Sequence, residues 1–127
     1  MISNPKTMLF VAATILLIVA ILLSGGGRDP KRLADRTDRA IVLRRWGRRC
    51  AFRWITWHRC RGPIVMDHQR PHSRGGRTVP RNLQPACARH NSTKGAIPNR
   101  RFVLRHTIPV VGPVVYFVRW WRAEVGR

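Results

Sequence analysis

An uninterrupted apolar run near the N-terminus constrains this chain more than any other feature. Met8–Leu23 reads MLFVAATILLIVAILL and contains no charged residue, Gly or Pro. With Thr7 and Ser24–Gly27 it reaches about 20 residues, the length of a helix that crosses a bilayer. The backbone there must be helical, because lipid offers it no hydrogen-bond partners. A chain of 127 residues could not cover such a helix on all sides, so we expect a transmembrane anchor and linker over residues 1–27.

The charges on either side of the run predict its orientation. Only Lys6 precedes it, whereas five basic residues follow closely: Arg28, Lys31, Arg32, Arg36 and Arg39. By the positive-inside rule we expect a single-pass membrane protein whose domain faces the cytoplasm. A cleaved signal peptide, which would make the protein secreted, is the alternative. Two features weigh against that alternative: only one lysine precedes the apolar run, and no A-x-A cleavage site follows it.

The charge balance narrows the class of partner. The chain has 25 Lys and Arg against 5 Asp and Glu, a net charge of +20. This disfavours an enzyme of uncharged metabolites and favours a polyanion, either nucleic acid or an anionic membrane. Because the apolar run takes many of the hydrophobic residues, the soluble part must fold around a thin core. Three cysteines are too few for a disulfide scaffold, so metal ligation is the better explanation of how that core is held.

Breakers and caps divide the rest of the chain. Residues 28–49 form a basic connector that we expect to be helical from Lys31 to about Arg45, with Asp29-Pro30 as its start and Gly47 as its end. Residues 50–96 then form the main domain, and residues 97–127 are a basic and apolar extension. We expect the extension to be a pair of strands that completes the domain. A membrane-edge anchor is the alternative for it.

Within residues 50–96 the pattern is strand, loop, short strand and helix. We expect a strand that ends at Asp67-His68 and a helix over Pro85–Lys94. A polar loop rich in Gly and Pro follows the strand. Before the strand, we expect Cys50 to Cys60 to be a strand or a turn that contributes aromatic side chains to the core, since it holds Phe52, Trp54, Ile55 and Trp57.

The stretch from Asp67 to Gly95 carries the chemistry. An Asp beside a His at a strand end offers a hard oxygen ligand and a base that titrates near neutral pH. In the following helix Cys87, His90 and Asn91 lie three and four residues apart, so they project from one face. They can present a Cys/His pair to one metal and an amide oxygen to a neighbouring site.

These residues resemble the signature of HNH endonucleases of the His-Me finger (ββα-metal) group. The elements occur in order as Asp67-His68, Pro71, Gly75-Gly76, Asn82-Leu83, Cys87-x-x-His90-Asn91 and Lys94-Gly95. The resemblance covers about Cys50 to Gly95, less than half of the chain. It implies an α+β fold, a small ββα-metal domain preceded by a single transmembrane helix. It also implies metal-dependent hydrolysis of DNA phosphodiester bonds that leaves 5′-phosphate and 3′-hydroxyl ends.

The resemblance assigns a role to each residue of the site. His68 would take a proton from the attacking water, and Asp67 with Asn91 would hold one divalent cation, Mg²⁺ or Mn²⁺. Asn82 would tie down the loop and orient the His68 backbone without touching the metal. His72 is either a solvated loop residue or a phosphate contact. The basic residues expected to bind nucleic acid are Arg70, Arg74, Arg77, Arg81 and Lys94.

A structural zinc is a further implication, since many family members hold one with two Cys-x-x-Cys pairs. The second pair is Cys87-x-x-His90 here, which can still bind zinc. The first pair is altered, because Arg53 stands three residues after Cys50. The preferred ligands are therefore Cys50, Cys60, Cys87 and His90. In the alternatives, His58 replaces one cysteine, or no zinc is bound and Cys50 is a buried thiol.

A function of another class also stays open. A catalytically silent, basic membrane adaptor could bind nucleic acid through the same fold. A silent module would be expected to lose one of the four site residues Asp67, His68, Asn82 and Asn91. Because all four are present, the sequence favours the endonuclease.

Overall fold

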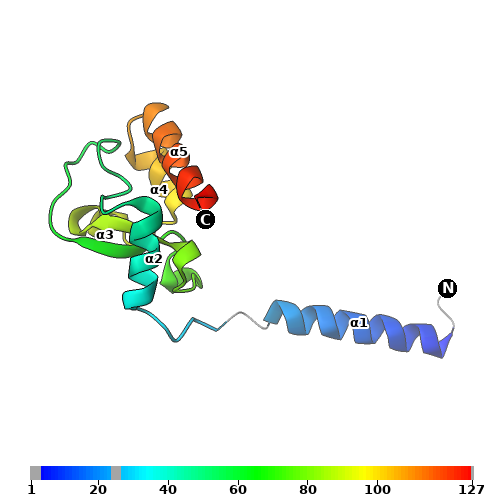
Figure 1. The fold of residues 1–127 in the computed structure, drawn as a ribbon. Coiled ribbons are helices and arrows are strands. Elements are labelled where there is room, and N and C mark those ends of the chain that lie inside the picture. The colour runs from blue at the N-terminus through cyan, green and yellow to red at the C-terminus, as the bar shows by residue number, and fades with distance from the viewer. Residues whose placement is uncertain (1–3, 24–26, 127) are drawn as a thin grey trace.

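The structure is a computed structural model that describes residues 4–23 and 27–126. Helix α1 (Pro5–Leu23) stands apart from the globular body (Figure 1). Its segment Pro5–Leu22 has a mean hydropathy of 2.2, and the rest of the described chain does not bury it. Among the described residues it is the one helix that could cross a membrane by length and composition, and a signal sequence would meet the same criteria. Of the linker expected at Ser24–Gly27, all but Gly27 lies outside the described residues.

The second helix begins later than its sequence predicts. α2 spans Arg36–Trp46, and the chain from residue 28 to 35 is not helical. Asp35 accepts a hydrogen bond from the Asp38 amide at 2.8 Å, and the Asp38 carboxylate accepts one from the Asp35 amide, which is a capping box. Asp29 is therefore not the cap. The predicted end of the helix at Gly47 is confirmed.

Two strands and a helix form the central unit. β1 (Ile64–His68) pairs antiparallel with β2 (Leu83–Cys87), and α3 (Ala88–Lys94) follows β2 directly. The connection between the strands holds two 3-10 turns, η1 (His72–Arg74) and η2 (Pro80–Asn82). The predicted helix over Pro85–Lys94 was wrong in its first turn, since Pro85 lies in β2. The Pro85 carbonyl bonds to the Ala51 amide on the side away from β1, so the missing N–H of this proline costs no bond between the strands.

The C-terminal extension is helical, and the prediction of two strands there was wrong. α4 spans Asn99–His106 and α5 spans Val111–Val125. Their buried residues lie on one face of each helix, with Tyr116 and Ala123 seven residues apart on α5. Short stretches of alternating apolar and basic residues look strand-like locally, whereas the spacing over the whole segment is that of a helix.

The core lies between the sheet and the helices α2, α4 and α5 (Figure 1). Phe52 is at its centre, with ring centroids 5.0 Å from Phe102 and 5.6 Å from Tyr116. Trp54 and Trp57, which we expected in the core, are 82% and 70% exposed. The predicted α+β class is confirmed. The ββα unit packs on this core, which is completed by residues before the unit, such as Phe52, and after it, such as Phe102 and Tyr116.

Candidate active site and metal centre

A pocket of about 500 Å³ opens beside β1 and α3. Asp67 and His68 border it from the end of β1, and Asn91 borders it from α3. The connector forms part of the wall through residues that include Arg28 and Arg32. The structure thus brings together the three residues expected to act on the scissile phosphate. It also adds a wall that the motif did not predict.

His68 is held in one tautomer by a chain of two hydrogen bonds. Its Nε2 lies 2.9 Å from Thr78 Oγ1, and the Thr78 hydroxyl donates to the Lys31 carbonyl of the connector. A carbonyl oxygen can only accept, so the single hydroxyl proton is used there. Nε2 must then carry a proton and donate it to Thr78. This leaves the Nδ1 lone pair of His68 free to accept a proton from water.

The surroundings of His68 favour its neutral form. Burial lowers the pKa of His68, electrostatic interactions with His72 and Lys94 lower it further, and the charge of Asp29 opposes them. The rings of His68 and His72 are edge to face, 5.8 Å apart. His72 donates from Nε2 to the Asp29 carbonyl at 2.7 Å, so it ties the connector to the loop. The expectation of a solvated side chain is therefore wrong, whereas a phosphate contact stays a prediction, because His72 also lines the pocket beside His68.

Asp67 is buried, and each of its carboxylate oxygens accepts one hydrogen bond. Only 4% of it is exposed, and its Oδ1 accepts from Lys94 Nζ at 2.9 Å while Oδ2 accepts from Gln84 Nε2 at 2.8 Å. Burial raises the pKa of Asp67, and the charge of Lys94 opposes this. Lys94 is 1% exposed and donates also to the His68 carbonyl at 2.7 Å. The prediction that Lys94 contacts nucleic acid was wrong, because the buried carboxylate requires this ammonium as its counter-ion.

A buried amide network lies behind Asp67. Gln84 and Asn99 exchange two hydrogen bonds, at 2.9 Å and 2.8 Å. The Tyr116 hydroxyl donates to Gln84 Oε1 at 2.7 Å. Helices α4 and α5 therefore fix Gln84, and Gln84 fixes the Asp67 carboxylate. Sequence reasoning missed these three residues, because their partners lie at least 15 positions away along the chain.

Asn82 closes the loop that follows β1. Its Oδ1 accepts from the Arg70 amide at 2.8 Å, and its Nδ2 donates to the Arg70 and Arg77 carbonyls at 3.0 Å and 2.9 Å. Gly76 packs inside this loop, where a Cβ would stand 1.8 Å from the Arg70 carbonyl oxygen. Through these three hydrogen bonds, the Asn82 amide holds the backbone of the loop at Arg70 and Arg77. The basic residues of the loop are all exposed, namely Arg70, Arg74, Arg77 and Arg81.

The four residues of the preferred zinc set lie together. The ligand atoms of Cys50, Cys60, Cys87 and His90 are all within 4.8 Å of one another. His90 Nδ1 is 3.1 Å from Cys87 Sγ, 3.4 Å from Cys50 Sγ and 3.6 Å from Cys60 Sγ. Burial raises the pKa of the Cys50 thiol to about 12, so a cation must displace a proton to bind it.

The outer contacts of His90 prepare it for a metal. Its Nε2 lies 3.1 Å from the His58 carbonyl and 2.6 Å from Thr56 Oγ1, whose proton goes to the same carbonyl. Nε2 is therefore the protonated nitrogen, and the Nδ1 lone pair points at the three sulfurs. His58 contributes its backbone oxygen here, and its ring is not among the four ligand groups that lie together, so the structure favours the preferred set over one in which His58 replaces a cysteine.

Comparison with known proteins fits this geometry. Residues 57–96 match the HNH endonuclease family model. The matched HNH domain contains β1, β2 and α3 with His68, Asn82 and Asn91, and it indicates a nuclease that acts on nucleic acid. The connector, Cys50, α4 and α5 lie outside it. Searches among curated proteins and among solved structures found no match to the chain.

Proposed function

We propose that this protein is a metal-dependent HNH endonuclease that hydrolyses DNA phosphodiester bonds and is anchored in a membrane by α1. One observation carries the catalytic part. Asp67, His68 and Asn91 border one pocket, and the hydrogen bonds of His68 leave its Nδ1 free. In the proposed reaction Nδ1 takes a proton from the water that attacks phosphorus. The imidazolium that forms keeps its Nε2–H bond to Thr78.

A divalent cation, Mg²⁺ or Mn²⁺, fits beside Asp67 and Asn91. Carboxylate and amide oxygens are the ligands that such cations prefer, and each Asp67 oxygen keeps a lone pair beyond its present bond. A bound cation would stabilise the charge that develops on the phosphate and on the leaving 3′ oxygen. Asn82 acts only by fixing the loop, and the exposed loop arginines bind flanking phosphates.

We further propose that Cys50, Cys60, Cys87 and His90 bind a structural zinc. The support is the direction of the His90 Nδ1 lone pair toward three sulfurs that lie within ligand distance of one another. The ion would join the segment before β1 to the start of α3. Two parts of a thin core would then be held together.

The membrane part of the proposal rests on α1. An exposed apolar helix of 19 residues is long enough to span a bilayer. The basic residues that follow it favour a single-pass arrangement with the HNH domain in the cytoplasm. Mass analysis of the mature protein separates this from the signal-peptide alternative, because cleavage would remove α1.

The deciding experiment is plasmid cleavage by the full chain in detergent, with and without Mg²⁺. His68→Ala should lower the rate by about 10²–10⁴-fold while DNA binding persists. His106→Ala, an exposed histidine on α4, is the matched control and should cleave at the native rate. A native protein that binds plasmid but never cuts it would support the silent adaptor instead.

A further inference from the structure

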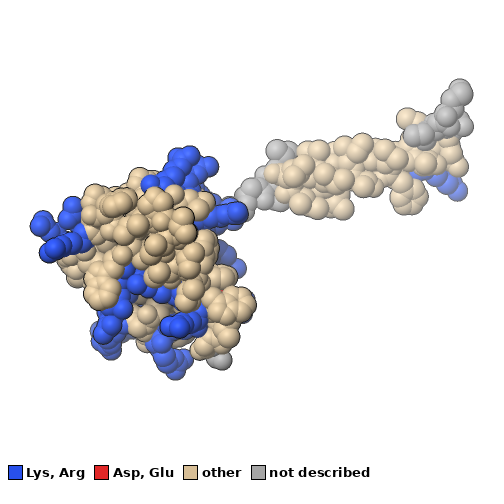
Figure 2. Space-filling view, turned by 90° about the horizontal axis from the view of Figure 1, so that it is seen from above, with Lys and Arg blue, Asp and Glu red and all other residues tan. Residues whose placement is uncertain are grey.

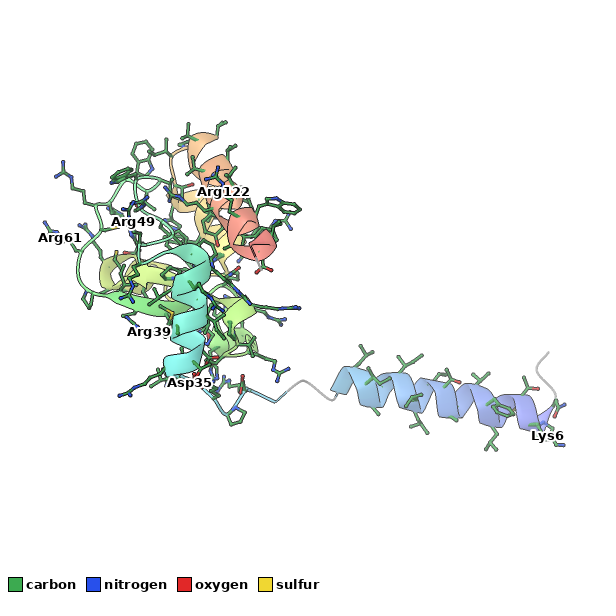
Figure 3. The ribbon with its side chains drawn as sticks, in the orientation of Figure 1. Lys6, Asp35, Arg39, Arg49, Arg61 and Arg122 are labelled. Atoms are coloured by element: carbon green, nitrogen blue, oxygen red, sulfur yellow. The ribbon has the colours of Figure 1, made fainter. Side chains whose placement is uncertain are left out.

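Five arginines line a second cavity, of about 220 Å³, at the C-terminal end of α2. They come from three parts of the chain and are Arg45, Arg49, Arg53, Arg119 and Arg122. Figure 3 shows Arg49 and Arg122 near this end of α2, with Asp35 and Arg39 at the other end. None of the lining residues that the structure describes is acidic. The cavity is therefore a concentrated positive site away from the HNH pocket residues.

Among the described residues, the arginines that line this cavity form no salt bridge. Arg45 Nη1 is buried without a hydrogen-bond partner, the one side-chain atom of the described chain in that condition. Arg119 Nη1 donates to the Ala51 and Arg53 carbonyls at 2.8 Å and 3.0 Å, so backbone oxygens fix it. Burial and the charge of Arg53 lower the pKa of Arg119. A buried guanidinium nitrogen without a hydrogen-bond partner is unfavourable, and an anion in the cavity would remove that cost.

An apolar face of α5 adjoins the cavity. Val114, Phe117, Val118 and Trp121 are exposed at helical spacing and line an open groove. Arg122 borders both the groove and the arginine cavity, so the two surfaces are continuous. On the face of the body shown in Figure 2, Lys and Arg side chains surround a tan area and no Asp or Glu is visible. An apolar surface next to a basic cavity that has room for a phosphate matches the two zones of a lipid monolayer.

We propose that this face of α5 docks on an anionic bilayer, with a lipid phosphate in the arginine cavity and Phe117, Val118 and Trp121 at the level of the acyl chains. The bilayer is favoured over DNA because a phosphate backbone gives an apolar groove nothing to pack against. It is favoured over a second copy because two surfaces of the same charge repel each other. The proposal rests on the membrane anchoring proposed above, which keeps the body close to the lipid.

Tryptophan fluorescence of the full chain in vesicles tests the docking, because α1 contains no tryptophan. The protein is reconstituted in phosphatidylcholine alone or with phosphatidylglycerol, both with brominated acyl chains that quench nearby indoles. We expect stronger quenching in the anionic vesicles. Trp121→Phe should remove most of the difference, whereas Trp57→Phe, which changes an exposed tryptophan outside α5, should not.

Arginine variants test the cavity. Arg49→Ala and Arg122→Ala should each lower the docked-to-undocked ratio on anionic vesicles about fivefold. Arg105→Ala removes the same charge from an exposed site on α4 and should leave that ratio near the native value. Equal quenching in the two kinds of vesicle, or an equal loss with Arg105→Ala, would overturn the proposal. So would variants that weaken DNA binding in detergent but quench like the native protein, since the cavity would then belong to the DNA interface.

Two controls separate this proposal from the ones on which it rests. Flotation with neutral vesicles reports the insertion of α1 independently of α5. Plasmid cleavage by the same samples in detergent reports the nuclease. A protein that floats and cuts but shows no charge-dependent quenching refutes the docking alone.

Discussion

Thr78→Val tests whether the connector helps to set the catalytic base. Thr78 is 1% exposed, so valine keeps the volume and removes only the hydroxyl. Two hydrogen bonds are lost, one from His68 Nε2 and one to the Lys31 carbonyl. At about 1 kcal/mol for each bond, the free energy of unfolding should fall by about 2 kcal/mol. A protein with the usual free energy of unfolding, about 5–15 kcal/mol, stays folded at room temperature after this loss.

The effect on catalysis should be larger than the effect on DNA binding. Without Thr78 the His68 ring has no fixed tautomer and no fixed orientation. Residues that hold a functional histidine in this way are worth about 10–100-fold. We therefore expect kcat for plasmid cleavage to fall by about that factor, which corresponds to about 1.4–2.8 kcal/mol in the activation free energy. KM should stay near the native value, because exposed arginines bind the DNA.

Two further variants make the test specific. Thr78→Ser keeps the hydroxyl and should recover most of the lost kcat. Thr93→Val removes a threonine hydroxyl that donates to the Arg89 carbonyl within α3, and it should leave kcat unchanged. A native kcat for Thr78→Val, or an equal defect for Thr78→Ser, would show that His68 does not depend on this contact.

Four other predictions concern the ion pair, the zinc, the connector and the DNA. Lys94→Met should lower the free energy of unfolding by about 3–5 kcal/mol, because it leaves the Asp67 carboxylate buried and unpaired, and adding Asp67→Asn should recover part of that loss in a denaturant titration. Metal analysis should find about one zinc per chain, Cys87→Ala should lose it, and a strong chelator should unfold the native body. The amides of Thr78 and Lys31 lower the pKa of Asp29 in the folded protein. Its contribution to stability is therefore present above the unfolded pKa of about 3.9 and is lost as pH falls through the lower folded pKa. Proteolysis after Lys31 should increase in acid, and Asp29→Ala should show the same increase at neutral pH. DNA affinity should fall with salt at a slope of about −4 to −5 in log–log form if about 5 phosphates are contacted, and Arg77→Ala should reduce the slope by about 1.

Local spacing was enough to predict the parts of the site that lie within one motif. Asp67, His68, Asn82 and Asn91 occur in an order that indicates their proximity, and the structure places them around one pocket and its loop. The odd cysteine count pointed to metal rather than disulfides. In agreement, the ligand atoms of three cysteines and one histidine lie close enough for a single ion.

Partners that are distant in sequence could not be predicted in this way. Nothing around Thr78 signals that its hydroxyl meets a carbonyl 47 residues earlier. Lys94 sits in a basic stretch that looks solvated, and only the fold reveals that it faces Asp67. Asp29-Pro30 has the local form of a helix start, but the Asp29 carboxylate binds the amides of Lys31 and Thr78, and α2 begins at the capping box of Asp35 and Asp38.

Tyr116 makes the HNH domain inseparable from the last helix of the chain. Its hydroxyl holds Gln84 and its ring stacks on Phe52, and both of those residues lie far from it in sequence. A recombination event that transferred only residues 57–96 would leave the Gln84 amide without its Tyr116 partner. It would also remove the aromatic side chains of Phe52 and Tyr116 from the core. The smallest unit that could be exchanged between proteins intact therefore runs from Asp29 of the connector to the end of α5. Recombination at the ends of the segment that matches the family model, residues 57–96, would yield the HNH motif without the residues that hold its side chains in place.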